Sequence, residues 1–167
     1  ALPSIGRDLD TDVAGLQWIV TGYLVTLASL ILLGGALGDH FGRRRVFLIG
    51  VATFAGASAL CAAAPTVETL VAARALQGAG GALLAPGSLA ILEASFRSED
   101  RPPAIGAWSG LAGITTAVGP PLGGWLVDAA SWRWTFLLSV PLALGALWIA
   151  IRHVPESRGA PSNARLD

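Results

Sequence analysis

Three groups of residues with chemical or conformational potential interrupt a largely apolar chain of 167 residues. The first is GALGDHFGRRRVFL, Gly35–Leu48, which places one Asp, one His and three Arg between two apolar runs. The second is an isolated Arg74 with Gln77 three residues later, and the third is GPPLGG at 119–124. These residue types favour charge pairing, electrostatic control of nearby acids and backbone bending.

Asp39 is the unusual member of the first group. It follows a long apolar run, and an anion at a helix C-terminus is disfavoured by the helix dipole. This placement indicates a specific cationic partner, either Arg43 or another cation. The alternative is a simple turn whose arginines only set membrane orientation. Close backbone approach in such a connection is permitted by glycines at 34, 35, 38 and 42.

Arg74 is the one charge within its apolar run. An arginine at the bilayer centre costs roughly 2.5–3.5 kcal/mol on insertion scales, so it usually faces a cavity or a partner. Gln77 lies on the same helix face, three residues on. The pair is therefore expected to line a polar cavity, with Arg74 as a fixed positive charge, because arginine does not release its proton. The alternative is that Arg74 extends to the outer membrane interface.

The glycine-rich segment around 119–124 has a mechanical interpretation. Gly106 with Gly110, and Gly119 with Gly123, form small-xxx-small patterns that allow close helix packing. Pro120 and the proline after it remove backbone donors and are expected to bend or loosen the helix. The residues either serve packing alone or help a cavity open to one side at a time.

The elements that carry these residues are predicted to be membrane helices. Charged residues make up 13% of the chain, about half the share in a typical soluble domain, and hydrophobic residues make up 53%. Runs near or above the 18 apolar residues typical of a membrane helix recur along the chain. These charge-free runs are 13–38, 46–67, 75–92, 102–127 and 134–151. The sequence therefore predicts an all-α integral membrane protein with helices at about 13–37, 46–64, 68–96, 103–129 and 132–151.

The segments outside these helices are polar. Residues 1–5 are interpreted as the last turn of a helix whose body is missing, and 6–12 as a short loop. Thr66 and Glu68 are candidate caps after Pro65. Residues 97–103 are expected to form a loop, and 152–167 a polar linker or disordered tail.

The arginines indicate orientation. With alternating loops, eight arginines fall on one side of the membrane, and only Arg7 and Arg133 fall on the other. By the positive-inside rule, the Asp39 stretch and the C-terminal tail are cytoplasmic.

Several function classes are disfavoured by the composition. The net charge is zero, so no basic surface points to nucleic acid. Cys61 is the only cysteine, and the two histidines lie far apart in sequence, so a metal site is not expected. Ser88 has no base at matching membrane depth, and no phosphate-binding loop is present, so neither an enzyme nor an ATP-driven pump is predicted.

The first group resembles the signature loop of the major facilitator superfamily, G-x-L-x-D-x-x-G-R-R, between the second and third helices. The positions that match are Gly35, Leu37, Asp39, Gly42, Arg43 and Arg44. RALQGAGGA, 74–82, is similar to the R-x-x-Q-G motif on the fourth helix of drug:proton antiporters, so the resemblance assigns Arg74, Gln77 and Gly78 to the cavity and to proton coupling.

The third group resembles the fifth-helix antiporter motif, G-P-x-x-G-G. The matching positions are Gly119, Pro120, Gly123 and Gly124, while Thr115 replaces a usual leading glycine. LQWIVTGYLV and SWRWTFLLSVP are similar to segments of the fourteen-helix branch of drug antiporters, and ALP to the end of its first helix. By this resemblance, residues 1–5 are a first-helix remnant, 6–151 are helices two to six of the N-terminal six-helix bundle, and 152–167 are a cytoplasmic linker or tail.

The resemblance implies a secondary transporter that exports small lipophilic, drug-like compounds in exchange for protons. It would be a multi-pass protein of the inner (plasma) membrane, in contact with lipid, driven by the proton gradient and needing no cofactor. The alternatives are an uptake facilitator for a metabolite, or a membrane fragment without transport activity. A charge latch of Asp39 and Arg43, extended by Glu93 and Arg97, is also implied. The acidic residue of the family's first helix is absent, so these 167 residues alone are expected not to transport.

Overall fold

The computed structural model describes residues 1–158, and every regular element in this part of the chain is an α-helix. This confirms the all-α prediction. The elements are α1 Leu2–Asp8, α2 Val13–Phe41, α3 Arg43–Ala63, α4 Val67–Ser95, α5 Arg101–Ala129, α6 Arg133–Leu137 and α7 Ser139–His153.

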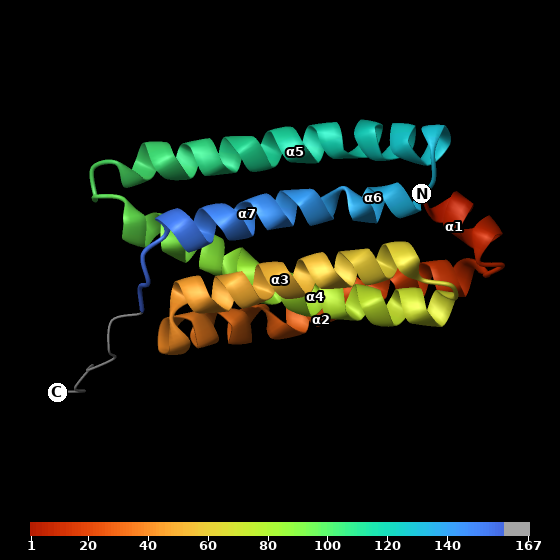
Figure 1. Cartoon of the computed structure of the whole chain (residues 1–167), viewed down its shortest axis with the longest axis horizontal. Coiled ribbons are helices and arrows are strands. Elements are labelled where there is room, and N and C mark those ends of the chain that lie inside the picture. Colours follow the sequence, from red (N-terminus) through yellow and green to blue (C-terminus); the bar gives the residue numbers. More distant parts are fainter. Residues whose placement is uncertain (159–167) are drawn as a thin grey trace.

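The long helices run side by side along one axis of the molecule (Figure 1). The α2–α3 and α4–α5 connections and the end of α7 lie at one end. The α1–α2, α3–α4 and α5–α6 connections lie at the other. Each long helix, with α6 and α7 taken together, therefore crosses the molecule once, as the predicted topology requires.

The core forms where α4 packs against α2 and α3. Glycines let these backbones approach closely, since an added Cβ on Gly80 would lie 2.6 Å from Phe54 N, and one on Gly50 2.8 Å from Leu84 N. On the other face of α4, a Cβ on Gly78 would lie 2.5 Å from the Tyr23 carbonyl oxygen. Helix association of this kind relies on small residues, because lipid provides no hydrophobic drive between helices.

α5 is set apart from this core. None of its residues is buried, and its few contacts are mainly with α4 and α6. Gly106, Gly110, Gly119 and Gly123 have no atom within 4 Å of an added Cβ. The predicted close packing at these glycines is therefore not made within residues 1–158.

Three helix boundaries differ from the sequence-based expectation. α1 continues through Gly6 to Asp8, so the predicted polar loop begins later. Pro102 and Pro103 fall in the first turn of α5, where the missing N–H groups cost nothing, rather than in a loop. The last helix divides into α6 and α7, and Pro141 lies in the first turn of α7, where it has no N–H to offer the preceding turn.

Other boundaries agree closely. Thr66 is the N-cap of α4, and its hydroxyl accepts from Thr69 N at 3.3 Å. Pro86 of α4 and Pro120 of α5 lie inside continuous helices, and the bend expected at Pro120 stays a prediction. The predicted tail begins after α7, with residues 154–158 described and 159–167 outside the described residues.

Within residues 1–158, four segments are both long and apolar enough to cross a membrane: α2, α3, α4 and the α6–α7 segment Arg133–His153. α5 has 29 residues, about 43 Å of helix, but its glycines, prolines and threonines make it less apolar. The fifth membrane helix predicted from the sequence therefore stays a prediction.

The topology has a direct test in cysteine labelling of the intact protein, with Cys61 and any other native cysteine replaced by Ala. His40→Cys is expected to react from the cytoplasmic side with a membrane-impermeant maleimide, and Ser131→Cys from the opposite side. The two positions lie at opposite ends of the bundle. Labelling of both from one side would contradict the topology.

Candidate functional site

The polar centre of the bundle is built around Arg74 of α4. Its Nε donates to the Ile19 carbonyl oxygen at 3.2 Å, which ties α4 to α2. Its Nη1 donates to Gln77 Oε1 on the next turn. The guanidinium thus uses neutral oxygens, and no Asp or Glu within residues 1–158 forms an ion pair with it.

Two aromatic rings enclose the same guanidinium. Arg74 Cζ lies 4.2 Å from the centroid of the Tyr23 ring and 5.8 Å from that of Phe136 on α6. Both distances are within the range in which a cation is attracted to a ring face. Arg74 is therefore partly buried among α2, α4 and α6, and it does not extend freely to the outer interface.

Gln77 extends the hydrogen bonds to a third helix. Its Nε2 donates to Ser58 Oγ of α3 at 2.7 Å, and Ser58 Oγ donates to the Phe54 carbonyl oxygen at 2.7 Å. Ser58 is fully buried and Gln77 is 3% exposed. The resulting chain runs from the α3 backbone through Ser58 and Gln77 to Arg74. The sequence did not single out Ser58, since a serine in an apolar run carries no signal without its spatial neighbour.

Ser58→Ala is expected to lower the free energy of unfolding by ~1 kcal/mol, because it leaves the buried Gln77 amide without its acceptor. The measurement is thermal or denaturant unfolding of the intact protein in detergent. Ser29→Ala, the same change at an exposed position of α2, is the matched control. Equal stability of the two variants would show that the bond from Gln77 to Ser58 contributes nothing measurable.

Gly78, which follows Gln77, lies where α4 packs against α2. It lies against the Tyr23 backbone rather than facing open space. The resemblance assigned Gly78 to the cavity together with Arg74 and Gln77. In the structure Gly78 lets α4 approach α2 closely, and Arg74 on the same helix reaches the Ile19 carbonyl oxygen. The assignment of Gly78 to the cavity stays a prediction.

The signature stretch forms a tight corner between α2 and α3. α2 continues through Asp39 to Phe41, and Gly42 alone connects the two helices, with φ of 112°. Few residues other than glycine adopt this backbone conformation. Gly35 and Leu37 lie on the last turns of α2, and Arg43 and Arg44 begin α3.

This corner brings Asp39 and Arg43 together. Arg43 Nη2 lies 2.8 Å and Arg43 Nε 2.9 Å from Asp39 Oδ1, and Arg43 Nη1 donates to the Ala90 carbonyl oxygen of α4 at 3.3 Å. The pair therefore connects α2, α3 and α4. Glu93 and Arg97, predicted to extend the latch, are exposed and pair with neither residue among the described contacts.

A partner of this corner that the sequence did not single out is Glu156, in the segment after α7. Its Oε1 accepts from Arg44 N at 3.1 Å, and Oε2 lies 3.6 Å from Arg45 Nε. Arg44 also donates through Nη2 to the Ile151 carbonyl oxygen at 2.6 Å. An anion at the N-terminus of α3 is favoured by the helix dipole. Residues 154–158 thus dock on the corner, whereas only their polarity could be predicted from the sequence.

The third motif borders an apolar groove of about 410 Å³ between α5 and the α6–α7 segment. Gly119 and Gly123 line it, whereas Pro120 and Gly124 do not. Thr115 and Thr135 are its polar members. Gly119 and Gly123 therefore lie on the face of α5 that is directed toward α6 and α7.

The fold and these sites define a polytopic α-helical membrane protein with a polar centre between its helices. A family model described as Major Facilitator Superfamily matches residues 1–166. The chain belongs to this superfamily, which confirms the resemblance of its motifs.

Curated relatives carry names that refer to resistance and export. The chain is 40% identical over 167 residues to the "Methylenomycin A resistance protein" of Bacillus subtilis, covering 99% of this chain and 36% of the relative. It is 44% identical over 158 residues to the "Tetracenomycin C resistance and export protein" of Streptomyces glaucescens, covering 95% and 29%. The chain thus spans about a third of the length of these relatives.

A solved structure supports the fold. The inward-open xylose transporter XylE from E. coli superposes with a TM-score of 0.73 at 21% identity, covering 93% of this chain and 43% of that one. At this identity the likeness establishes the helical arrangement alone. Together with the family match, it confirms the predicted fold class, an all-α membrane bundle of this superfamily.

Proposed function

We propose that the protein of which these residues form part exports small lipophilic compounds in exchange for protons. The observation that carries the proposal is the environment of Arg74, a partly buried cation held by carbonyl and amide oxygens and by two aromatic rings. A fixed charge in such a site favours the ionised form of any acid that comes near it. If the helices move, the distance between the acid and Arg74 changes, and so does the tendency of the acid to release its proton. Proton release can then be coupled to the movement of the helices.

The names of the relatives support the choice of substrate class. One relative is named for resistance to methylenomycin A, and another for resistance to and export of tetracenomycin C. Proposed partners are therefore small antibiotic-like molecules, protons and membrane lipid, with the proton gradient as energy source and without a further cofactor. The proposed location is the inner (plasma) membrane.

The test is transport by the intact protein in inverted membrane vesicles. An imposed proton gradient is expected to drive uptake of ethidium, methylenomycin A or tetracenomycin C into the vesicles, and a protonophore is expected to abolish it. Transport insensitive to the protonophore would contradict proton coupling. Gradient-driven movement in the opposite direction would favour the alternative, an uptake facilitator.

Asp39→Asn is expected to reduce export at least about threefold while membrane insertion stays normal. The substitution removes the ion pair between Asp39 of α2 and Arg43 of α3. A pair with a solvent-exposed partner contributes about 0–1 kcal/mol to stability, so the loss of export is expected in the conformational step rather than in folding. Export rates and membrane levels are measured together.

Asp100→Asn provides the matched control for Asp39. It removes an exposed carboxylate that makes no capping bond at the start of α5. A double exchange, Asp39→Arg with Arg43→Asp, is expected to recover part of the export. Unchanged export in Asp39→Asn would contradict a role of the ion pair in export and would favour the alternative, in which the signature stretch is only a turn.

A further inference from the structure

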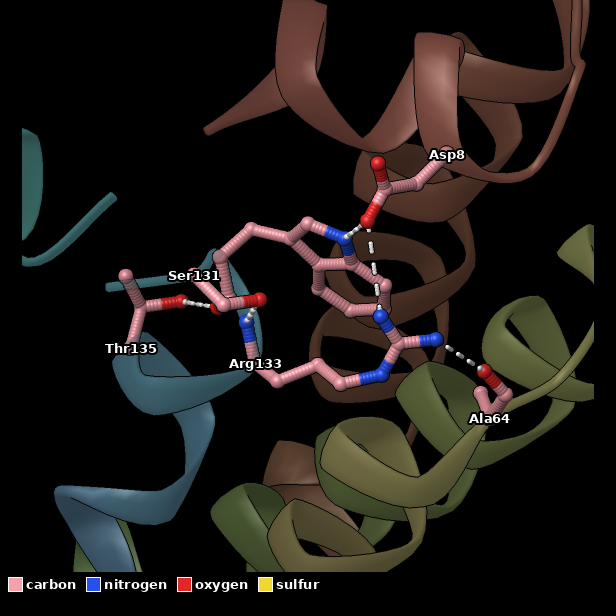
Figure 2. Close-up of polar contacts among 6 residues, drawn as sticks. Asp8, Ala64, Ser131, Arg133 and Thr135 are labelled. Carbon is pink, nitrogen blue, oxygen red and sulfur yellow. Dashed lines mark hydrogen bonds and ion pairs between the residues drawn. The ribbon is translucent and has the colours of Figure 1, made fainter. Parts of the chain in front are cut away.

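A cluster of polar contacts at the outer end of the bundle joins three parts of the chain that are distant in sequence (Figure 2). Asp8 ends α1, Ala64 follows α3, and Trp132 and Arg133 begin α6. We call these four residues the outer clasp. Trp132 and Arg133 lie in the SWRWTFLLSVP segment, which resembles the fourteen-helix branch, and none of the four residues belongs to the three motif groups or to the polar centre described above.

Asp8 is the acceptor at the centre of the clasp. Trp132 Nε1 donates to Asp8 Oδ2 at 2.9 Å, and Arg133 Nη1 lies 3.5 Å from the same oxygen. Arg133 Nη2 donates to the Ala64 carbonyl oxygen at 3.2 Å, and its Cζ lies 4.4 Å from the Trp132 ring centroid. Figure 2 shows the arginine reaching between Asp8 and Ala64 from the start of α6.

Trp132 is anchored in the core as well as in the clasp. Its side chain is only 1% exposed, and it packs in one cluster with Ile5, Cys61, Leu70 and Ala73. A tryptophan buried to this extent normally needs a partner for its N–H, and Asp8 supplies it. The position of the indole therefore depends on both the apolar cluster and one carboxylate.

The clasp reaches the polar centre through one aromatic contact. Phe136 lies one turn after Trp132 on α6, and the two rings meet edge to face, with centroids 6.1 Å apart and planes at 90°. The other side of this connection is Arg74, whose Cζ lies 5.8 Å from the Phe136 centroid. A continuous series of contacts thus runs from Asp8 through Trp132 and Phe136 to Arg74.

Apolar packing also holds the start of α6, since α6 contacts α3 and both Trp132 and Phe136 pack with the apolar cluster. Among the described residues, the polar contacts of this turn to other parts of the chain are those of the outer clasp. α5, which precedes α6, has no buried residue and packs only lightly. Only one residue, Leu138, separates α6 from α7, so α6 is a short segment of five residues between two connections. The outer clasp is consequently the main polar restraint on the turn that presents Phe136 to Arg74.

We propose that Asp8 and Trp132 are positioning residues for Arg74, and that the outer clasp sets the aromatic enclosure of the guanidinium by holding Phe136 over it. The functional part of this inference rests on the proposed function, because it assigns the clasp a role in the export step that uses Arg74. The structural part stands on the contacts alone and has its own measurement.

The structural test is the ¹⁹F spectrum of the intact protein in nanodiscs, with 4-fluorophenylalanine placed at position 136 only. Arg74→Leu marks the resonance of the ring without its cation. Asp8→Ala is expected to move the resonance toward that position, whereas Asp8→Asn is expected to leave it near the wild-type position, because the amide oxygen still accepts from the indole. Asp10→Asn is the matched control, since Asp10 makes none of the clasp contacts.

The outcomes decide the proposal in either case. An unmoved resonance in Asp8→Ala would overturn it, and so would an equal shift in Asp10→Asn. Should Asp8→Ala fold poorly, Arg133→Gln tests the same restraint, because it removes the contacts to Asp8 and Ala64 while keeping the indole. It is expected to move the resonance in the same direction by a smaller amount.

The functional test is a double-mutant cycle on ethidium export. Asp8→Ala and Phe136→Leu are each expected to lower the maximal export rate three- to tenfold with less change in the half-saturating concentration. The double variant is expected to be no worse than Phe136→Leu alone, because both act through one contact. Additive losses would overturn the coupling. Absence of export by the wild type would contradict the proposed function, and the ¹⁹F result would still decide the clasp.

Discussion

Replacing Arg74 by Leu is expected to lower export by about 30-fold or more. The change removes the charged hydrogen bonds to the Ile19 carbonyl oxygen and to Gln77, and each such bond is worth about 1.5–3 kcal/mol. A loss of only 2 kcal/mol in the export step already corresponds to roughly 30-fold. The measurement is the initial rate of ethidium uptake into inverted vesicles, normalised to protein level.

Arg74→Lys separates charge from geometry. Lysine keeps the positive charge but presents it as a point, and it cannot serve two oxygens and stack between two rings as a flat guanidinium does. We expect it to recover only part of the export lost in Arg74→Leu. Arg7→Lys, the same change at an exposed position, is the control. Full export by Arg74→Leu would contradict the proposal that export needs the positive charge of Arg74.

The part of the polar centre that lies on a single helix, Arg74 and Gln77 of α4, could be predicted from the sequence. A charge within an apolar run requires compensation, and Gln77 three residues on lies on the same helical face, so the pair followed from spacing. Ser58, Tyr23 and Phe136 could not be predicted in this way. They come from three other helices, and only the packing of those helices on α4 brings them to Arg74.

The same distinction applies to the two ends of the bundle. The pairing of Asp39 with Arg43 is local, one helical turn apart, and the unfavourable dipole position of Asp39 pointed to it. The contact of Glu156 with the start of α3 and that of Asp8 with Trp132 join residues more than a hundred positions apart. Charge patterns along the chain give no information on such pairs.

The glycines illustrate a further limit of sequence patterns. The small-xxx-small spacing in α5 predicted close packing, yet those glycines have open space around them. Gly80 of α4, which has no small residue four positions away, lies against α3. A pattern of small residues shows that two helices can approach closely. It does not show which helix approaches, because that depends on the arrangement of the whole bundle.

Gly80→Val is therefore expected to cause the largest loss of stability among the substitutions considered. An added Cβ would lie 2.6 Å from Phe54 N and 3.0 Å from the Gly50 carbonyl oxygen, and both are backbone atoms that cannot rotate away. α3 and α4 would have to separate along their contact, and overpacking of this kind costs about 1–3 kcal/mol or more. We expect a lower unfolding temperature and a smaller fraction of monodisperse protein in detergent.

The matched control for Gly80→Val is Gly56→Val on α3, where an added Cβ meets nothing within 4 Å. Both variants place the same β-branched side chain in a membrane helix, so any difference between them reports the contact between α3 and α4. The separation should also weaken the bond from Gln77 on α4 to Ser58 on α3, which lies beside this contact. Export by Gly80→Val is thus expected to fall even in the fraction that folds. Equal unfolding temperatures for the two variants would contradict close packing of α3 on α4 at Gly80.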